Sequence, residues 1–185
     1  TFRTSFNTDI NYSNSMYFNP TYDWGSNARN VNATLSNFVG MGTYWNLNEL
    51  LEYNREFGQH TVGVMVSHES QESKWQNLSA RRSGYLTNNI FDINAGAAPG
   101  TNGGGSGNWG MESYLGRLNY NYDSRYIVTG TLRRDGSSNF GPEKRWGTFP
   151  SISAAWRIAQ EEFFQVPLIS ELKLRIETGL TGNQG

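Results

Sequence analysis

The side chains that could perform acid–base or metal chemistry are few and widely spaced in this sequence. His60 and His68 are the only two histidines, and they lie eight positions apart. Along a strand that separation is about 26 Å, so the two imidazoles cannot bind one metal ion. Glu161 and Glu162 are adjacent, and a solvated pair of linker carboxylates explains them better than a catalytic dyad does.

A glycine-rich run matches a nucleotide-binding pattern in its letters but not in its context. Residues 105–110, GSGNWG, fit G-x-G-x-x-G, yet they follow a loop-like stretch and open a strand-like one. A dinucleotide site needs a strand before the glycines and a helix after them. Cysteine is absent, which excludes disulfides and thiolate metal ligands. We therefore expect no catalytic residue, no metal and no cofactor, and the protein is predicted not to be an enzyme.

The composition favours strands with polar loops. Hydrophobic residues make up 36%, aromatic residues reach 14%, and there are 21 glycines. The net charge of −1 gives no basic surface that would indicate a nucleic-acid partner. No apolar run approaches the roughly 18 residues that a membrane-spanning helix needs. A membrane is still compatible with this composition, because a transmembrane barrel strand faces lipid only at every second residue.

Period-two alternation predicts about seven strands, so the fold class is all-β and antiparallel. The predicted strands cover residues 1–12, 43–53, 60–69, 111–122, 125–133, 148–158 and 172–180. Residues 54–58, 123–124 and 160–171 form short or medium turns, whereas 13–40, 73–108 and 135–147 are longer polar connections. Short turns that alternate with long loops, and strands of about 9–11 residues, are typical of an outer-membrane barrel.

In such a barrel the two faces of each strand meet different surroundings. The polar side chains predicted to face the lumen are Arg3, Asn7, Arg117, Asn119, Arg157, Lys173, Arg175 and Glu177. An aromatic girdle at the membrane interface is predicted from Tyr53, Tyr120, Tyr122 and Tyr126, which lie near the short turns. An exposed sheet face would explain each strand singly, and cross-strand pairing would explain the rings.

Two stretches carry a resemblance to a known family. Residues 135–158, DGSSNFGPEKRWGTFPSISAAWRI, and 172–185, LKLRIETGLTGNQG, resemble the barrel of the SusC/RagA family, the TonB-dependent outer-membrane transporters of the Bacteroidetes. The resemblance implies that residues 1–185 are part of one barrel domain of roughly 22 strands. It also implies a plug and a signal peptide, which we do not find in this sequence.

The resemblance further implies a function, partners and a location. A SusC-like protein imports oligosaccharides or peptides across the bacterial outer membrane, where the lipid bilayer surrounds the barrel. It works with a SusD-like lipoprotein outside and with TonB in the periplasm, through segments not present here. Aromatic rings in loops could stack on sugar rings, and the candidate ligand contacts are Trp24, Trp75, Trp109 and Trp146.

Two alternatives remain open at this point. A soluble β-sandwich, such as a carbohydrate-binding module, would fold in water with Phe2 and Phe6 packed against Leu172 and Ile176. A passive porin-like barrel would share every strand feature and differ only in lacking a plug and the segment that contacts TonB.

Overall fold

The fold is given by a computed structural model that describes residues 1–25 and 28–182. Asn183 and Gln184 of the terminal Thr-Gly-Asn-Gln motif lie outside these ranges. The strands within them are β1 (Phe2–Asn19), β2 (Tyr22–Asp23), β3 (Arg29–Asn30), β4 (Thr34–Phe57), β5 (His60–Ser83), β6 (Ala98–Tyr122), β7 (Tyr126–Ser137), β8 (Trp146–Arg157) and β9 (Lys173–Gly179). Three short 3-10 helices are η1 (Ile93–Ala95), η2 (Pro142–Lys144) and η3 (Ile158–Gln160).

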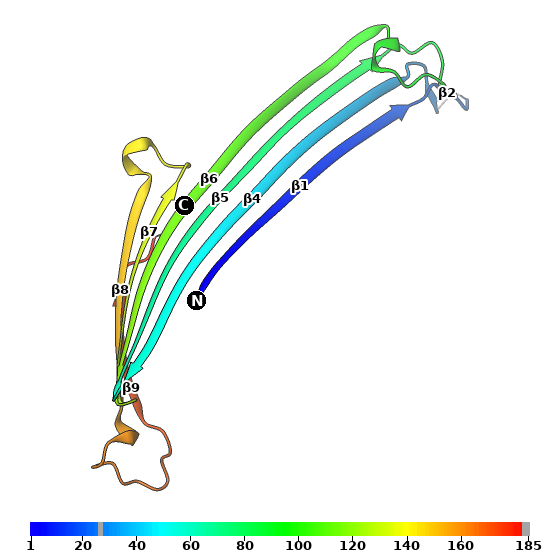
Figure 1. The fold of residues 1–185 in the computed structure, drawn as a ribbon. Helices are drawn as coiled ribbons and strands as arrows, with labels where there is room; N and C mark the ends of the chain where they lie inside the picture. Colours follow the sequence, from blue (N-terminus) through cyan, green and yellow to red (C-terminus); the bar gives the residue numbers. More distant parts are fainter. Residues whose placement is uncertain (26–27, 183–185) are drawn as a thin grey trace. The chain divides into compact units, whose positions relative to one another are not determined.

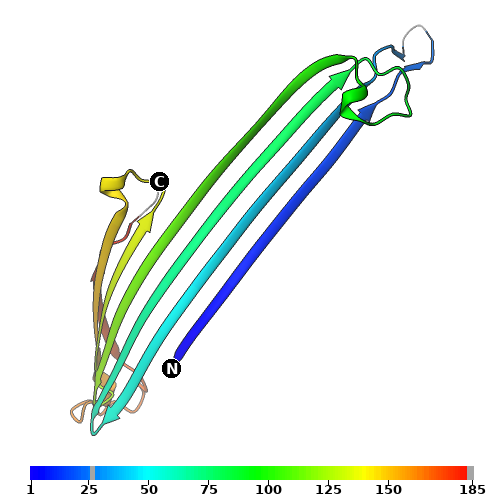
Figure 2. The same ribbon diagram turned by 45° about the horizontal axis from the view of Figure 1, so that its top comes forward.

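Seven of the described strands form one sheet in the order β1-β4-β5-β6-β7-β8-β9 (Figure 1). The long strands β1, β4, β5 and β6 run side by side (Figure 2). The small strands β2 and β3 pair separately, with Tyr22 opposite Asn30. The all-β antiparallel fold with seven main strands, predicted from the sequence, is confirmed.

Among the strands that the structure describes, none forms the second layer that a sandwich requires. A β-sandwich packs two sheets face to face and buries the side chains between them. Here Phe2, Phe6 and Ile176, which that alternative would bury, are exposed by 63%, 64% and 68%. The soluble-sandwich arrangement is therefore not the one this chain adopts.

Four strands are longer than the sequence predicts. β1 continues to Asn19, β4 begins at Thr34, β5 continues to Ser83 and β6 begins at Ala98. The predicted loops 13–40 and 73–108 were therefore wrong in extent. Only residues 20–33 and 84–97 connect these strands, and the first of these segments also contains the β2–β3 pair.

The glycines of β6 explain why its extension was mistaken for a loop. Glycine usually marks turns, because it tolerates backbone conformations that other residues avoid. In β6 it instead allows β5 to come close. A Cβ on Gly100 would lie 2.6 Å from the carbonyl oxygen of Arg81, and a Cβ on Gly107 would lie 2.6 Å from Nε1 of Trp75. Glycine in a strand often marks this kind of close approach.

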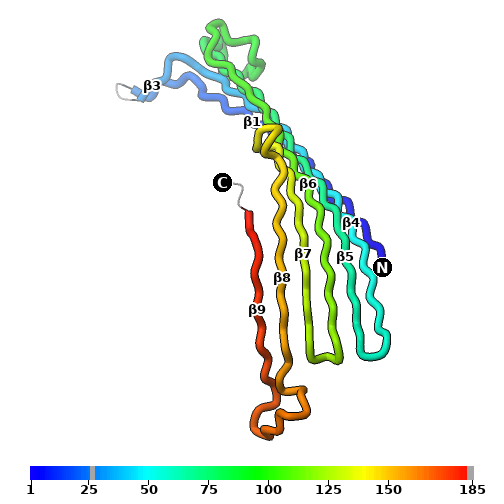
Figure 3. Tube along the Cα trace, turned by 90° about the vertical axis from the view of Figure 1, so that its left-hand side faces the viewer, coloured from blue at the N-terminus to red at the C-terminus, as the bar shows by residue number. Residues whose placement is uncertain are grey.

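The contrast between short and long connections is weaker than predicted. Residues 58–59, 123–125 and 158–172 connect strands at one end of the sheet (Figure 3). The third of these is as long as the connections 20–33 and 84–97 at the other strand ends. The larger difference is in strand length: β4 and β5 have 24 residues each, whereas β7 and β8 have 12 each.

Contacts divide the chain into two compact units, one of residues 1–7, 45–72 and 109–185 and one of residues 8–44 and 73–108. The second unit contains a small core of Ala33, Leu35 and Tyr85, against which Phe18 packs. The Phe18 and Tyr85 rings meet edge to face at 5.5 Å. The Tyr85 hydroxyl donates a hydrogen bond to the Asp92 carbonyl oxygen at 3.1 Å. Burial of the Tyr85 ring raises the pKa of its hydroxyl.

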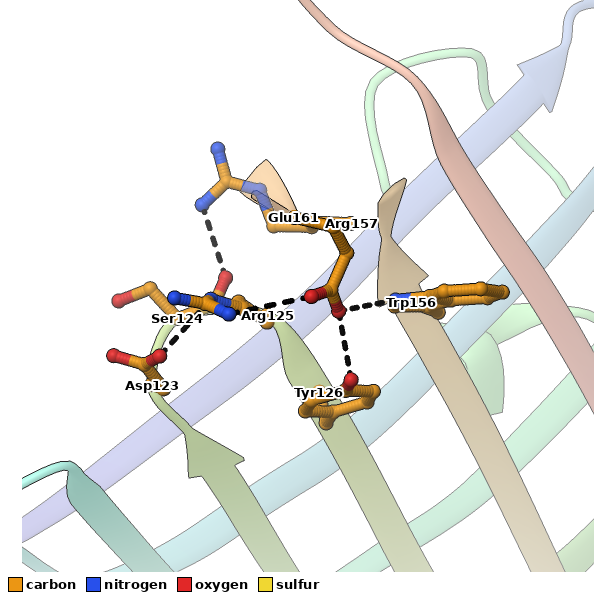
Figure 4. A network of polar contacts seen from close by, with 7 residues as sticks. All are labelled: Asp123, Ser124, Arg125, Tyr126, Trp156, Arg157 and Glu161. Atoms are coloured by element: carbon orange, nitrogen blue, oxygen red, sulfur yellow. Dashed lines mark hydrogen bonds and ion pairs between the residues drawn. The ribbon is translucent and has the colours of Figure 1, made fainter. Parts of the chain in front are cut away.

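In the first unit, the Glu161 carboxylate fixes the β8–β9 connection to the sheet (Figure 4). Its Oε1 accepts hydrogen bonds from the Tyr126 hydroxyl at 2.7 Å and from the Trp156 indole at 2.8 Å. Its Oε2 lies 3.2 Å from Arg125, which also pairs with Asp123 at 2.9 Å. The Glu161 side chain is only 9% exposed. The prediction that Glu161 is a solvated linker carboxylate was therefore wrong.

Neutralising Glu161 should destabilise the fold in a pH-dependent way. The Tyr126 and Trp156 hydrogen bonds and the Arg125 charge lower the Glu161 pKa, and burial opposes them. A lowered pKa stabilises the fold above the ordinary value of 4.5, and this contribution is lost as pH falls below it. We expect Glu161→Gln to lower the urea midpoint of unfolding at pH 7, and the difference from wild type should shrink progressively as the pH falls below 4.5. Glu162→Gln, on the exposed neighbour, should not change the midpoint; an equal loss in both variants would contradict the role of Glu161.

The β6–β7 turn should accept glycine with a gain in stability. Asp123 and Ser124 have φ values of 53° and 55°, a left-handed conformation that L-residues adopt at a cost. This pair of positive φ values is characteristic of tight hairpin turns that favour Asn-Gly. We expect Ser124→Gly to stabilise the fold by about 0.5–1 kcal/mol, measured by urea unfolding. Gly58→Ala, at φ 59° in the β4–β5 turn, should be destabilising instead.

Candidate functional site

A row of aromatic rings crosses the sheet beside its tight turns. Phe57 of β4 stacks on His60 of β5 at 5.4 Å, and His60 meets Tyr122 of β6 at 5.0 Å. Tyr122 stacks on Tyr126 of β7 at 6.3 Å, which is followed by Trp156 of β8 at 6.4 Å. We call these rings the turn-end row. Each tight turn places the first ring of one strand opposite the last ring of the previous strand.

The turn-end row collects three of the four residues predicted as an aromatic girdle. Tyr122 and Tyr126 are members, and the Tyr120 hydroxyl lies 2.7 Å from Nδ1 of His60. Tyr53 lies four residues before Phe57 on β4, so strand alternation places it on the same face. The structure thus brings these tyrosines to one face and one end of the sheet, while their position in a membrane remains a prediction.

Residues on the opposite face of β6 to β9 are mainly polar. Strand pairing aligns Asn119 with Thr129, Thr129 with Ser153, and Ser153 with Glu177. Paired residues share a face, so six predicted lumen side chains lie together: Arg117, Asn119, Arg157, Lys173, Arg175 and Glu177. Four of them, Arg117, Asn119, Arg175 and Glu177, line a hollow of about 970 Å³. Arg175 pairs with Glu177 at 2.5 Å.

The two remaining lumen candidates lie on β1. Phe6 stacks on Trp45 of β4 at 6.3 Å, and Trp45 donates a hydrogen bond to Glu72 of β5 at 3.0 Å. Arg3 and Asn7 have the opposite parity to Phe6 along β1, so they point to the other face. Both are exposed. Alternation therefore places all eight predicted lumen residues on the face opposite the turn-end row.

Three of the four tryptophans predicted as ligand contacts lie in strands and not in loops. Trp24 lies between β2 and β3 and stacks on Tyr22 at 4.6 Å. Trp75, Trp109 and Trp146 lie within β5, β6 and β8, so their assignment to loops was wrong. Trp146 opens β8 and stacks on Tyr114 of β6 at 6.1 Å. The Arg134 guanidinium lies 5.0 Å from the centre of the Trp146 ring.

A charged cluster that the sequence did not predict lies on the face of the turn-end row. His68 of β5 approaches Glu49 of β4 at 3.0 Å through Nδ1 and Glu112 of β6 at 3.4 Å through Nε2. Its ring stacks on Tyr114 at 4.9 Å. Counting outward from the two-residue turn after Phe57 would have placed Glu49 opposite His68, and this signal was missed because the turn was predicted to be longer.

These clusters connect neighbouring strands of the sheet. The two histidines lie in separate clusters, as their spacing indicated. Among residues 1–25 and 28–182, no three His, Cys, Asp or Glu side chains are arranged to hold a metal ion. Within the same described ranges, no helix has both the length and the apolar character needed to cross a membrane. The G-x-G-x-x-G run 105–110 lies entirely within β6, where no helix follows it.

Comparison with curated proteins places the chain among TonB-dependent receptors, although no protein-family model matches it. It is 52% identical over 75 residues to TonB-dependent receptor SusC of Bacteroides thetaiotaomicron, which covers 40% of this chain and 8% of the relative. It is 34% identical over 146 residues to TonB-dependent receptor P26 of Formosa agariphila, which covers 76% of this chain and 15% of the relative. TonB-dependent receptor P3 of the same organism is 34% identical over 136 residues, 72% of this chain and 14% of the relative. The matched regions are thus a small part of each relative.

Solved structures share the fold. The RagAB peptide transporter matches 98% of this chain with a TM-score of 0.86 at 18% identity, using 20% of its own chain. The RagAB peptide importer in its closed-closed state matches 99% with a TM-score of 0.86, also at 18% identity and 20% of its chain. The sequence relatives and the shared sheet agree with the motifs at 135–158 and 172–185. The chain therefore belongs to the SusC/RagA family of TonB-dependent receptors, in which it corresponds to a stretch of the β-barrel.

Proposed function

We propose that residues 1–185 form part of the barrel wall of a bacterial outer-membrane importer for oligosaccharides or peptides. The importer is energised through TonB and works with a SusD-like lipoprotein outside the cell. Family membership supports the coarse function of nutrient import across the outer membrane. The structural neighbours are a peptide transporter and a peptide importer, which supports a polymeric nutrient.

The observation that carries the proposal is the difference between the two faces of one unlayered sheet. One face has a shallow apolar hollow whose lining includes Val64, Val66, Leu118, Leu132 and Ile152. The other face carries the hollow that contains Arg117, Arg175 and Glu177. A sheet in water would have to cover the first face with a second layer. Lipid tails cover such a face without one, and the polar face then borders the lumen.

The turn-end row fits the periplasmic surface of the outer membrane, where lipid headgroups meet water. Its tyrosines combine an apolar ring with a hydroxyl, which favours the level of the lipid headgroups. The short turns of an outer-membrane barrel face the periplasm, and the row lies beside the turns 58–59 and 123–125. In this arrangement the Glu161 cluster lies on the periplasmic side of the row.

Adjacent residues of β7 provide a matched test of which face meets lipid. Leu132 lies on the apolar face and Thr131 on the polar one. We expect Leu132→Arg to destabilise the receptor by about 2–4 kcal/mol, because a charge near the bilayer centre must leave water. Thr131→Arg should stay close to wild type. The measurement is refolding of the full-length receptor in lipid vesicles across a urea series; equal effects of the two variants would contradict the assignment of faces.

Genetics can separate energised import from passive diffusion. We expect deletion of the receptor gene to abolish growth on one class of nutrient, either a neutral oligosaccharide or a peptide digest. Loss of TonB should cause the same defect in a strain that keeps the receptor. A passive porin would continue to supply the nutrient without TonB. Growth on the corresponding monosaccharide or free amino acids is the control, and it should not change.

A further inference from the structure

The second unit contains a tryptophan laid over a floor of glycines. The Trp75 indole of β5 extends across β6, where a Cβ on Gly107 would meet three ring atoms at 2.6–3.1 Å. A Cβ on Gly105 would meet the far edge of the same ring at 3.5 Å. The side chain nevertheless remains exposed, with 51% of the residue surface accessible. One side of the indole is thus supported by backbone and the rest is open.

Small and polar residues continue this row toward β1. A Cβ on Gly42 of β4 would lie 2.7 Å from the Asn11 side-chain oxygen of β1, and a Cβ on Gly40 would lie 2.7 Å from the Ser13 hydroxyl. The missing side chains at Gly40 and Gly42 leave a hollow of about 420 Å³ beside Trp75. We call it the Trp75 groove, and it lies within the second unit.

The lining of the Trp75 groove is polar and almost free of net charge. Alternation gives the amide and hydroxyl side chains of Asn11, Ser13, Ser73 and Asn77 the same face as Trp75, together with the rings of Phe38 and Tyr44. Asp9 is the charged residue of this lining that lies on the face of Trp75, since Lys74 has the opposite parity to Trp75 along β5. Amides and hydroxyls can each donate and accept hydrogen bonds, so they match a ligand whose groups also do both.

From this arrangement we propose that the Trp75 groove is a subsite for a neutral oligosaccharide, with the indole as a stacking surface for one sugar ring. The inference rests on the proposed function and selects the sugar alternative within it. A pyranose has an apolar C–H face that fits an aromatic plane, and hydroxyls around its rim that fit amides. A mixed peptide would bring charged side chains and termini of both signs, and on this face the groove offers them only the Asp9 carboxylate.

The location of the groove agrees with a passage for substrate. Asn11 has the same parity along β1 as Asn7, so alternation gives both residues the face predicted to border the lumen. Leu78, three residues after Trp75, has the opposite parity and lies 3.6 Å from the Cβ position of Gly104. Leu78 is 64% exposed, so it is a large exposed side chain over a glycine on the other face. It provides a matched control for Trp75.

The test is calorimetric binding to the purified full-length receptor in detergent. The probes are neutral hexasaccharides with α-1,4, β-1,4 and β-1,3 glucose linkages, and a tryptic casein digest. We expect one hexasaccharide to bind wild type and Trp75→Ala to weaken its Kd about tenfold, a typical loss for one stacked ring. Trp75→Phe should retain part of the affinity, and Leu78→Ala should bind like wild type.

A second variant tests the glycine that lies beneath the Trp75 ring and keeps the tryptophan itself. Gly107→Val should displace the Trp75 ring and weaken hexasaccharide binding to a similar degree. A folded barrel migrates differently on a gel before and after heating, so a variant that keeps this shift has folded. If Gly107→Val fails to fold, Trp75→Phe still tests the role of the indole. Equal hexasaccharide affinity in wild type and Trp75→Ala would overturn the subsite and leave import intact. Binding of the peptide digest without binding of any hexasaccharide would overturn the sugar assignment. If neither kind of probe binds and growth on the nutrient does not need TonB, the proposed function is overturned as well.

Discussion

The alternation of side chains across a single sheet is the constraint on which the rest of this structure depends. Toward the tight turns the strands present mainly apolar residues to one side and polar residues to the other, and within the described residues no second layer covers either side. Such a sheet is stable only where its two faces meet different surroundings. Within the described residues, side chains therefore pack mainly against side chains of the neighbouring strand on the same face of the sheet. The small core around Leu35 is the main exception.

The parts of the fold that follow from alternation could be predicted from the sequence. The faces of Arg117 and Glu177, and the shared side of Tyr120 and Tyr122, need only the period of two and the approximate turn positions. The family could be predicted because residues 135–158 contain unusual residue combinations in the same order as in the SusC/RagA barrel. Both inferences use information that is local in the sequence.

The parts that were missed depend on pairing between strands. Trp75 and Gly107 make sense only when β5 and β6 are placed side by side, since a glycine-rich run alone indicates a loop. Glu161 was assigned to solvent because none of its three partners is adjacent to it in sequence. The Glu49–His68 pair required the exact register of a turn. Register is set by long-range hydrogen bonding, and an error of one residue exchanges the two faces.

The simple strand order has a consequence for how the protein assembles. Every main strand pairs with the next main strand along the chain, so the sheet is a succession of hairpins. Closing a two- or three-residue turn costs little chain entropy, whereas pairing distant segments costs more. Pairing should thus start at Gly58 and at Asp123, where the rings of the turn-end row meet first, and proceed along the strands. The glycine-rich start of β6 should be among the last segments to pair, because each of its residues gains little contact until Trp75 covers it.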